Sequence, residues 1–238
     1  MLVRFRSPFI FYKTTKTAGT SSEAALEQMI WGREPTHVKR MTVYRDGFVT
    51  KRGALSLERQ HELALDIKLR FFCEFGKELT PETKKIIALR NHSTVDDSKL
   101  ALSETFVRNA LKVVNVRNPW DKAVSAYFWK MRGRVPSQGI KGDFEKFASE
   151  YVPIGIDEDV CDIFDESWIA LRYESLETDL QELSRRCEFT KDFRLQGYKS
   201  HTRPAEFKSG EIYSDSAKRS IAKNWSHWID KFHYEFER

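Results

Sequence analysis

Lys16 and Gly19 belong to a short polar stretch whose residue types suit the binding of an anion. The stretch follows an apolar run, Phe9–Tyr12, and precedes apolar residues at helical spacing: Ala25, Leu26, Met29 and Ile30. A strand, a loop of small residues and a helix N-terminus bring backbone amides and the positive end of the helix dipole to one place. Lys16 adds a charge, and Thr20 with Glu23 is expected to cap the helix as a capping box. Residues 16–21 therefore form a candidate site for a phosphate-like group.

Arg117 and Ser125 form a second candidate anion site. An apolar run over Leu111–Val116 predicts a buried strand that ends at Arg117, and Pro119 suits the first turn of a following helix. That helix has one apolar stripe, made of Trp120, Ala123, Val124, Tyr127, Phe128 and Met131. Since Ser125 lies off this stripe, it can face, with Arg117, the crevice beyond the strand ends where α/β sheets bind ligands.

The two stretches together resemble one enzyme family. A nucleotide-binding P-loop has its lysine directly after the second glycine, whereas Lys16 precedes Gly19 by three positions. The segment Lys16-Thr17-Ala18-Gly19-Thr20-Ser21 resembles instead the 5′-phosphosulfate loop of sulfotransferases that use 3′-phosphoadenosine 5′-phosphosulfate (PAPS). Arg117 and Ser125, eight positions apart, resemble the motif that holds the 3′-phosphate in that family.

The resemblance implies a fold and an activity. The expected fold is α/β, with a central, mainly parallel sheet flanked by helices in the P-loop-like three-layer sulfotransferase architecture, as a single domain over residues 1–238. The expected reaction transfers the sulfuryl group of PAPS to a hydroxyl or amine of a small-molecule or glycan acceptor. The loop residues are expected to bind the phosphosulfate: Lys16, Thr17, Ala18, Gly19, Thr20 and Ser21. No metal is expected to take part.

The resemblance also implies nucleotide contacts for residues outside the two motifs. The segment over residues 172–176 looks like the family's R-Y-E-x-L element, in which the tyrosine, here Tyr173, lies near the adenine. A basic loop before the last helix offers Lys199, Ser200 and Arg203 to the 3′-phosphate. The chain departs from the family's pattern at Thr15, where proline is usual, and at Lys122, where arginine is common.

The transfer also requires a base that accepts the proton of the acceptor. Histidine is suited to this role near neutral pH, and members of the family often have a histidine or glutamate between the two motifs. His92 follows an expected strand and precedes a helix capped by Ser93 or Thr94, so it is the first candidate. The alternatives are Glu62, His37 and His61, or a packing role for His92.

The elements that position these residues follow from the apolar pattern. We expect a hairpin with arms over residues 41–44 and 48–51, and strands over 86–89 and 167–174. Helices are expected over 56–75, 98–109 and 143–151, and from about residues 175 and 214.

Composition narrows the functional class. The chain has 238 residues, 40% of them hydrophobic, and a net charge of +5, which suits a nucleotide ligand and is weak evidence for nucleic acid. It lacks a run of eighteen apolar residues and begins its expected first strand near residue 8, so we expect neither a membrane span nor a signal peptide. Three widely spaced cysteines (Cys73, Cys161 and Cys187) favour the cytoplasm.

Two other functions remain open. A P-loop-type kinase would turn over ATP with magnesium, but its lysine–serine pair is missing from the sequence. A non-catalytic protein that binds nucleotides or anionic glycans would bind adenosine 3′,5′-bisphosphate without transferring sulfate.

Overall fold

The structure is a computed structural model. It describes residues 1–5, 7–32, 42–44, 47–49, 92–132, 139–197 and 209–236. The expected helix over 56–75 and strand over 86–89 lie outside this part, as do Glu62, His37 and His61. No helix in the described ranges is long and apolar enough to cross a membrane.

A mixed sheet forms the centre of the described chain, with strand order β3-β4-β1-β2-β5-β6. The strands are β1 (Leu2–Arg4), β2 (Phe9–Tyr12), β3 (Thr42–Tyr44), β4 (Gly47–Val49), β5 (Leu111–Val116) and β6 (Trp168–Arg172). β2, β5 and β6 run parallel, whereas β1 pairs antiparallel with β2 and with β4, which forms the expected hairpin with β3. The carboxyl ends of β2 and β5 therefore lie side by side, and both candidate anion sites begin there.

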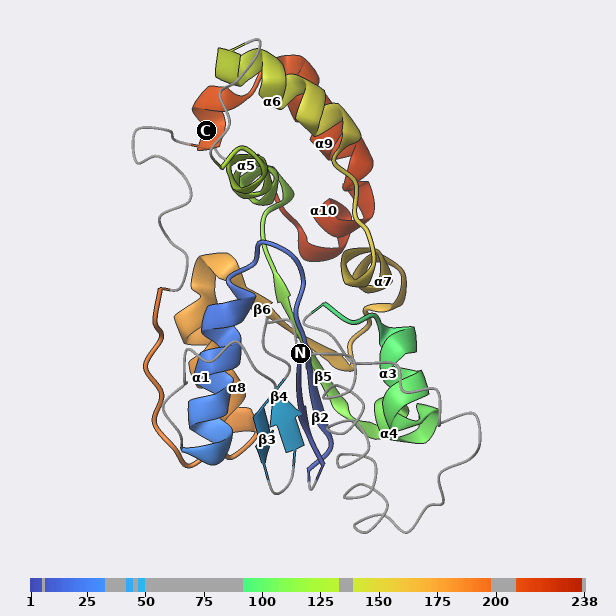
Figure 1. The fold of residues 1–238 in the computed structure, drawn as a ribbon, viewed down its shortest axis with the longest axis vertical. Coiled ribbons are helices and arrows are strands. Elements are labelled where there is room, and N and C mark those ends of the chain that lie inside the picture. Colours follow the sequence, from blue (N-terminus) through green and yellow to red (C-terminus); the bar gives the residue numbers. More distant parts are fainter. Residues whose placement is uncertain are drawn as a thin grey trace.

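Helices cover both faces of the sheet (Figure 1). α1 (Gly19–Trp31) and α8 (Leu176–Arg186) pack on one face, and α3 (Val95–Leu102) and α4 (Glu104–Asn109) lie on the other. The alternation along β2 explains this: Phe9 and Phe11 belong to the core beneath α1 and α8, whereas Ile10 and Tyr12 belong to the opposite core. The expected α/β class, with a sheet flanked by helices, is confirmed.

A cluster of helices rises beyond the carboxyl ends of the strands (Figure 1). It contains α5 (Pro119–Lys130), α6 (Gly139–Glu150), α9 (Asp215–Asn224) and α10 (Ser226–Phe232), and α7 (Ile156–Ile163) lies between it and the sheet. Two short 3-10 turns complete the described helical segments, Tyr173–Ser175 and Ser209–Ile212. Aromatic packing holds this cluster together: Tyr151 stacks on Trp225, whose ring meets Trp228 edge-on.

Most expected elements in the described ranges are present, with three corrections. Pro119 opens α5 as predicted, and Thr94 caps α3 with a complete capping box. The helix expected over 98–109 is two helices, α3 and α4, because Ser103 adopts a positive φ of 83° between them. The last helix is likewise divided at Trp225 into α9 and α10. α7 was not expected from the sequence, although it contributes a central residue to the site.

Candidate functional site

The loop between β2 and α1 turns sharply at two left-handed residues. Lys16 and Ala18 both have a φ of 57°, and Ala18 is the N-cap of α1 without a side-chain capping bond. The expected capping box of Thr20 and Glu23 is therefore wrong, because the helix begins at Gly19 and the Glu23 side chain points into the core. The left-handed turn replaces the side-chain cap.

The loop has backbone amides that an anion can bind, whereas the hydroxyl of Thr17 is hydrogen-bonded within the loop. The amides of Ser21 and Ser22 donate to the carbonyl of Ala18, whereas those of Gly19 and Thr20 have no acceptor within the described ranges. The Thr17 side chain is buried and donates to the carbonyl oxygen of Thr14 at 3.2 Å. Of the loop residues expected to bind the phosphosulfate, Lys16, Ala18 and Thr20 are partly exposed, whereas Thr17, Gly19 and Ser21 are buried.

A buried charge cluster supports the loop from behind. Lys13 Nζ lies 2.7 Å from Oε2 of Glu23, and the amino group of Met1 lies 3.0 Å from its Oε1. The Lys13 side chain reaches Glu23 by passing directly beneath Gly19. A Cβ atom at position 19 would lie 2.4 Å from Cγ of Lys13, so this position requires glycine for close approach.

Gly19→Ala is therefore expected to lower the free energy of unfolding by about 1–3 kcal/mol, the usual cost of overpacking a filled core. The added methyl group must displace the Lys13 side chain and disturb its contact with Glu23. Because Gly19 is the first residue of α1, alanine gains less there than the roughly 1 kcal/mol of helix propensity that it gains over glycine in a helix interior. Urea denaturation followed by circular dichroism measures the difference.

Ala18→Gly is the matched control for that substitution. It removes a methyl group one residue earlier, where the φ of 57° favours glycine, so stability should be unchanged or higher. Equal stability of Gly19→Ala and the unmodified protein would show that Lys13 has room to move.

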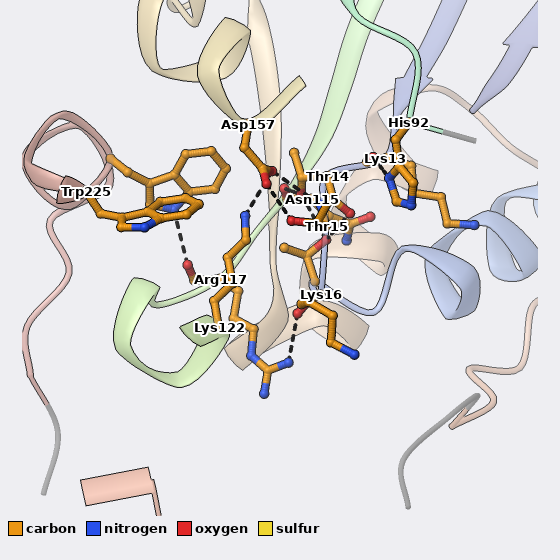
Figure 2. A network of polar contacts seen from close by, with 12 residues as sticks. Lys13, Thr14, Thr15, Lys16, His92, Asn115, Arg117, Lys122, Asp157 and Trp225 are labelled. Carbon is orange, nitrogen blue, oxygen red and sulfur yellow. Dashed lines mark hydrogen bonds and ion pairs between the residues drawn. The ribbon is translucent and has the colours of Figure 1, made fainter. Parts of the chain in front are cut away.

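Arg117 connects the second candidate site to the first. Its Nη1 donates to the carbonyl oxygen of Lys16 at 2.8 Å, although the two residues are 101 positions apart. The Nε donates to Oδ2 of Asp121 at 2.7 Å, and Nη2 forms an ion pair with the same oxygen. The guanidinium also lies over the ring of Tyr173, 3.8 Å from its centroid. Figure 2 shows the Lys16 and Arg117 side chains ending on the same side of the loop.

The other residues expected to bind PAPS have different placements. Tyr173 follows β6, is 41% exposed, and contacts Arg117 as described. Ser125 is a partly exposed residue of α5, and no hydrogen bond joins it to Arg117 or the loop in the described ranges. Lys199, Ser200 and Arg203 lie outside the described residues. The structure therefore brings Lys16, Arg117 and Tyr173 together.

Trp129 contacts the Lys16 side chain, and the sequence did not identify it as a site residue. Nζ of Lys16 lies over its ring, 4.4 Å from the centroid, and the guanidinium of Arg132 lies 4.1 Å from the same centroid. Such cation–π contacts stabilise a charged side chain in one place. Trp129 lies on α5 off the buried stripe, so a partly exposed aromatic residue off that stripe was the available signal.

His92 lies against Lys13, the residue three positions before Lys16 at the start of the loop. Its Nδ1 donates to the carbonyl oxygen of Lys13 at 2.6 Å, since a carbonyl can only accept. This bond places the proton on Nδ1 and leaves Nε2 with a free electron pair in the neutral ring. Although His92 is an exposed residue, desolvation of the ring lowers its pKa, and the hydrogen bond to the Lys13 carbonyl opposes this effect. The neutral form, which can act as a base, is therefore favoured near pH 7.

A buried ion pair reaches the loop from the helix cluster (Figure 2). Nζ of Lys122 lies 2.9 Å from Oδ1 of Asp157, and their side chains are 0% and 2% exposed. Oδ2 of Asp157 accepts a hydrogen bond of 2.5 Å from the Thr15 hydroxyl. Sequence analysis missed Asp157, because its partner Thr15 is 142 positions away and α7 itself was not expected.

No group of three or more metal-binding side chains occurs within the described ranges. No protein-family model, curated protein or solved structure matches the chain.

Proposed function

We propose that this protein is a sulfotransferase that uses PAPS as its sulfate donor. The observation that carries the proposal is the hydrogen bond from Arg117 to the carbonyl of Lys16, which joins two anion-binding elements from distant parts of the chain. One bisphosphorylated nucleotide can then contact both elements, with its 5′-phosphosulfate at the loop and its 3′-phosphate at Arg117. The two elements are the ones that resemble the PAPS motifs of the family.

Each part of the loop has a role in this proposal. Amides at the start of α1 and the ammonium of Lys16 hold the phosphosulfate and stabilise the charge that develops on the leaving phosphate oxygen. PAPS supplies the sulfuryl group, whose bond to the 5′-phosphate oxygen breaks as a bond to the acceptor oxygen or nitrogen forms. The left-handed turn at Lys16 and Ala18 aims these donors without rearrangement during the reaction.

The proton of the acceptor goes to a base, and His92 is the candidate in the described ranges. Its hydrogen bond to Lys13 fixes the tautomer with a free Nε2, and its lowered pKa favours the neutral ring. The acceptor is a hydroxyl or amine of a small molecule or glycan, with a carbohydrate as the first class to test.

The binding of the 3′-phosphate by Arg117 is the part of this proposal that a single substitution tests most sharply. Arg117→Ala should weaken binding of adenosine 3′,5′-bisphosphate by about 10- to 100-fold, as expected for loss of a charged hydrogen-bond donor. Binding of adenosine 5′-monophosphate, which has no 3′-phosphate, should weaken by a clearly smaller factor, which reflects only the loss of the bond from Arg117 to the Lys16 carbonyl. Isothermal titration calorimetry measures both dissociation constants.

Asp121→Asn is the matched control, because Asp121 competes with the nucleotide for the same guanidinium. Removing its charge should leave bisphosphate binding unchanged or make it tighter. Equal affinity of the unmodified protein for the two nucleotides, or an equal loss of both in Arg117→Ala, would count against a 3′-phosphate site at Arg117.

A further inference from the structure

The left-handed conformation of Lys16 requires support from the surrounding chain. A non-glycine residue with a φ of 57° is disfavoured by contact between its Cβ and its own backbone, so it persists only where neighbouring groups fix it. The carbonyl of Lys16 is held on one side by Arg117 at 2.8 Å. The preceding residue, Thr15, must be held as well if the turn is to keep its shape.

Asp157 holds Thr15 through both its backbone and its side chain. Oδ1 accepts from the Thr15 amide at 3.3 Å, and Oδ2 accepts from the Thr15 hydroxyl at 2.5 Å. The neighbouring Thr14 donates from its own hydroxyl to the carbonyl of Asn115 on β5 at 2.6 Å. Residues 14, 15 and 16 are therefore hydrogen-bonded to β5, α7 and Arg117, respectively.

The carboxylate of Asp157 is itself fixed by a buried cage. Lys122 pairs with it, and the Lys122 ammonium lies over Trp225 and Trp228, 4.5 and 4.4 Å from the ring centroids. Burial lowers the pKa of Lys122, whereas the pairing with Asp157 opposes that effect and favours the charged form. The ring nitrogens of both tryptophans donate to carbonyl oxygens, that of Trp228 to Arg117 at 3.1 Å. The cage therefore contains side chains from α5, α7, α10 and the junction of α9 with α10, and it contacts Arg117 of the second candidate anion site.

We propose that Asp157 is a positioning residue for the Lys16 loop, acting through the hydroxyl of Thr15, and that Lys122 holds Asp157 in place. The carboxylate contacts no ligand; it sets the conformation in which the amides and ammonium of the loop converge. The benefit to nucleotide binding rests on the proposed function, whereas the effect on the loop itself does not.

Thr15→Val tests this inference with little change in side-chain shape. It removes the hydroxyl and keeps the amide and the ion pair, whereas Thr15→Ser keeps the hydroxyl and is the matched control. Hydrogen exchange, measured by NMR, reports the amides of residues 15, 21 and 22, which are bonded to Asp157 or to the carbonyl of Ala18. We expect exchange about 10-fold faster or more in Thr15→Val and within about threefold of the unmodified protein in Thr15→Ser.

Amides of β5 separate a local effect from general destabilisation. Their exchange should stay unchanged in both variants, and Thr15→Val should weaken adenosine 3′,5′-bisphosphate binding by about 10-fold while Thr15→Ser does not. Unchanged exchange at residues 15, 21 and 22 in Thr15→Val, or an equal change in both variants or in β5, would overturn the inference. If the unmodified protein does not bind the bisphosphate, the proposed function fails, and the exchange rates alone decide the role of Asp157.

Discussion

Lys16→Ala is expected to lower the rate of sulfate transfer from PAPS by about 100-fold or more. In the proposed reaction the ammonium of Lys16 stabilises charge on the leaving phosphate oxygen, and removal of one such donor typically costs a factor of 10² to 10³ in kcat. The fold should be unaffected, because the side chain is partly exposed and alanine can keep the backbone conformation set by its neighbours. A radiolabelled transfer assay with a panel of hydroxyl acceptors measures the rate.

Lys130→Ala is the control for the loss of a positive charge outside the loop. Lys130 is exposed at the end of α5 and lies over Phe147 instead of the loop. Its replacement should leave transfer within about twofold of the unmodified rate, as expected for an exposed, screened charge. Equal rates for Lys16→Ala and Lys130→Ala would remove Lys16 from the mechanism.

Asp157→Ala is expected to lower the free energy of unfolding by about 3–5 kcal/mol. It leaves the ammonium of Lys122 without its anion in a site where the lysine side chain is 0% exposed, and an uncompensated buried charge is costly. The two tryptophan rings offset part of this cost only. Urea denaturation measures the loss, and it requires no assumption about the ligand.

Two comparisons separate the effect of burial on the free energy of unfolding from the effect of charge pairing. Asp96→Ala breaks the pair with Lys99, whose side chains are 83% and 43% exposed, and it should cost less than about 1 kcal/mol. The double substitution Lys122→Met with Asp157→Asn removes both buried charges, so it should be much less destabilising than the sum of the two single substitutions. Additive losses, or a loss below about 1 kcal/mol in Asp157→Ala, would contradict the account of this ion pair.

The sequence was informative where local pattern and chemistry coincide. An apolar run, a polar loop and a helical stripe predicted β2, the loop and α1, and the same logic predicted β5 and α5 with Pro119 at its start. The parallel pairing of β2 with β5 then brings Lys16 and Arg117 together, because parallel strands end at the same edge of a sheet.

The details of the loop depend on contacts that no local pattern contains. Ala18, not Thr20, is the N-cap of α1, because a left-handed turn and the buried Lys13–Glu23 pair take over the roles assigned to a capping box. Thr15 and Lys122 looked like two unrelated departures from the sulfotransferase pattern that the sequence resembles. In the structure both side chains contact Asp157. The two positions therefore belong to one set of contacts, which joins residues too far apart in the chain to be recognised from the sequence.

A crystal structure of the protein with adenosine 3′,5′-bisphosphate tests the central claim most directly. The account predicts one nucleotide with its 5′-phosphate at the amides and ammonium of the Lys16 loop and its 3′-phosphate at the Arg117 guanidinium. A nucleotide bound elsewhere, or one that reaches the loop while its 3′-phosphate points away from Arg117, would contradict it.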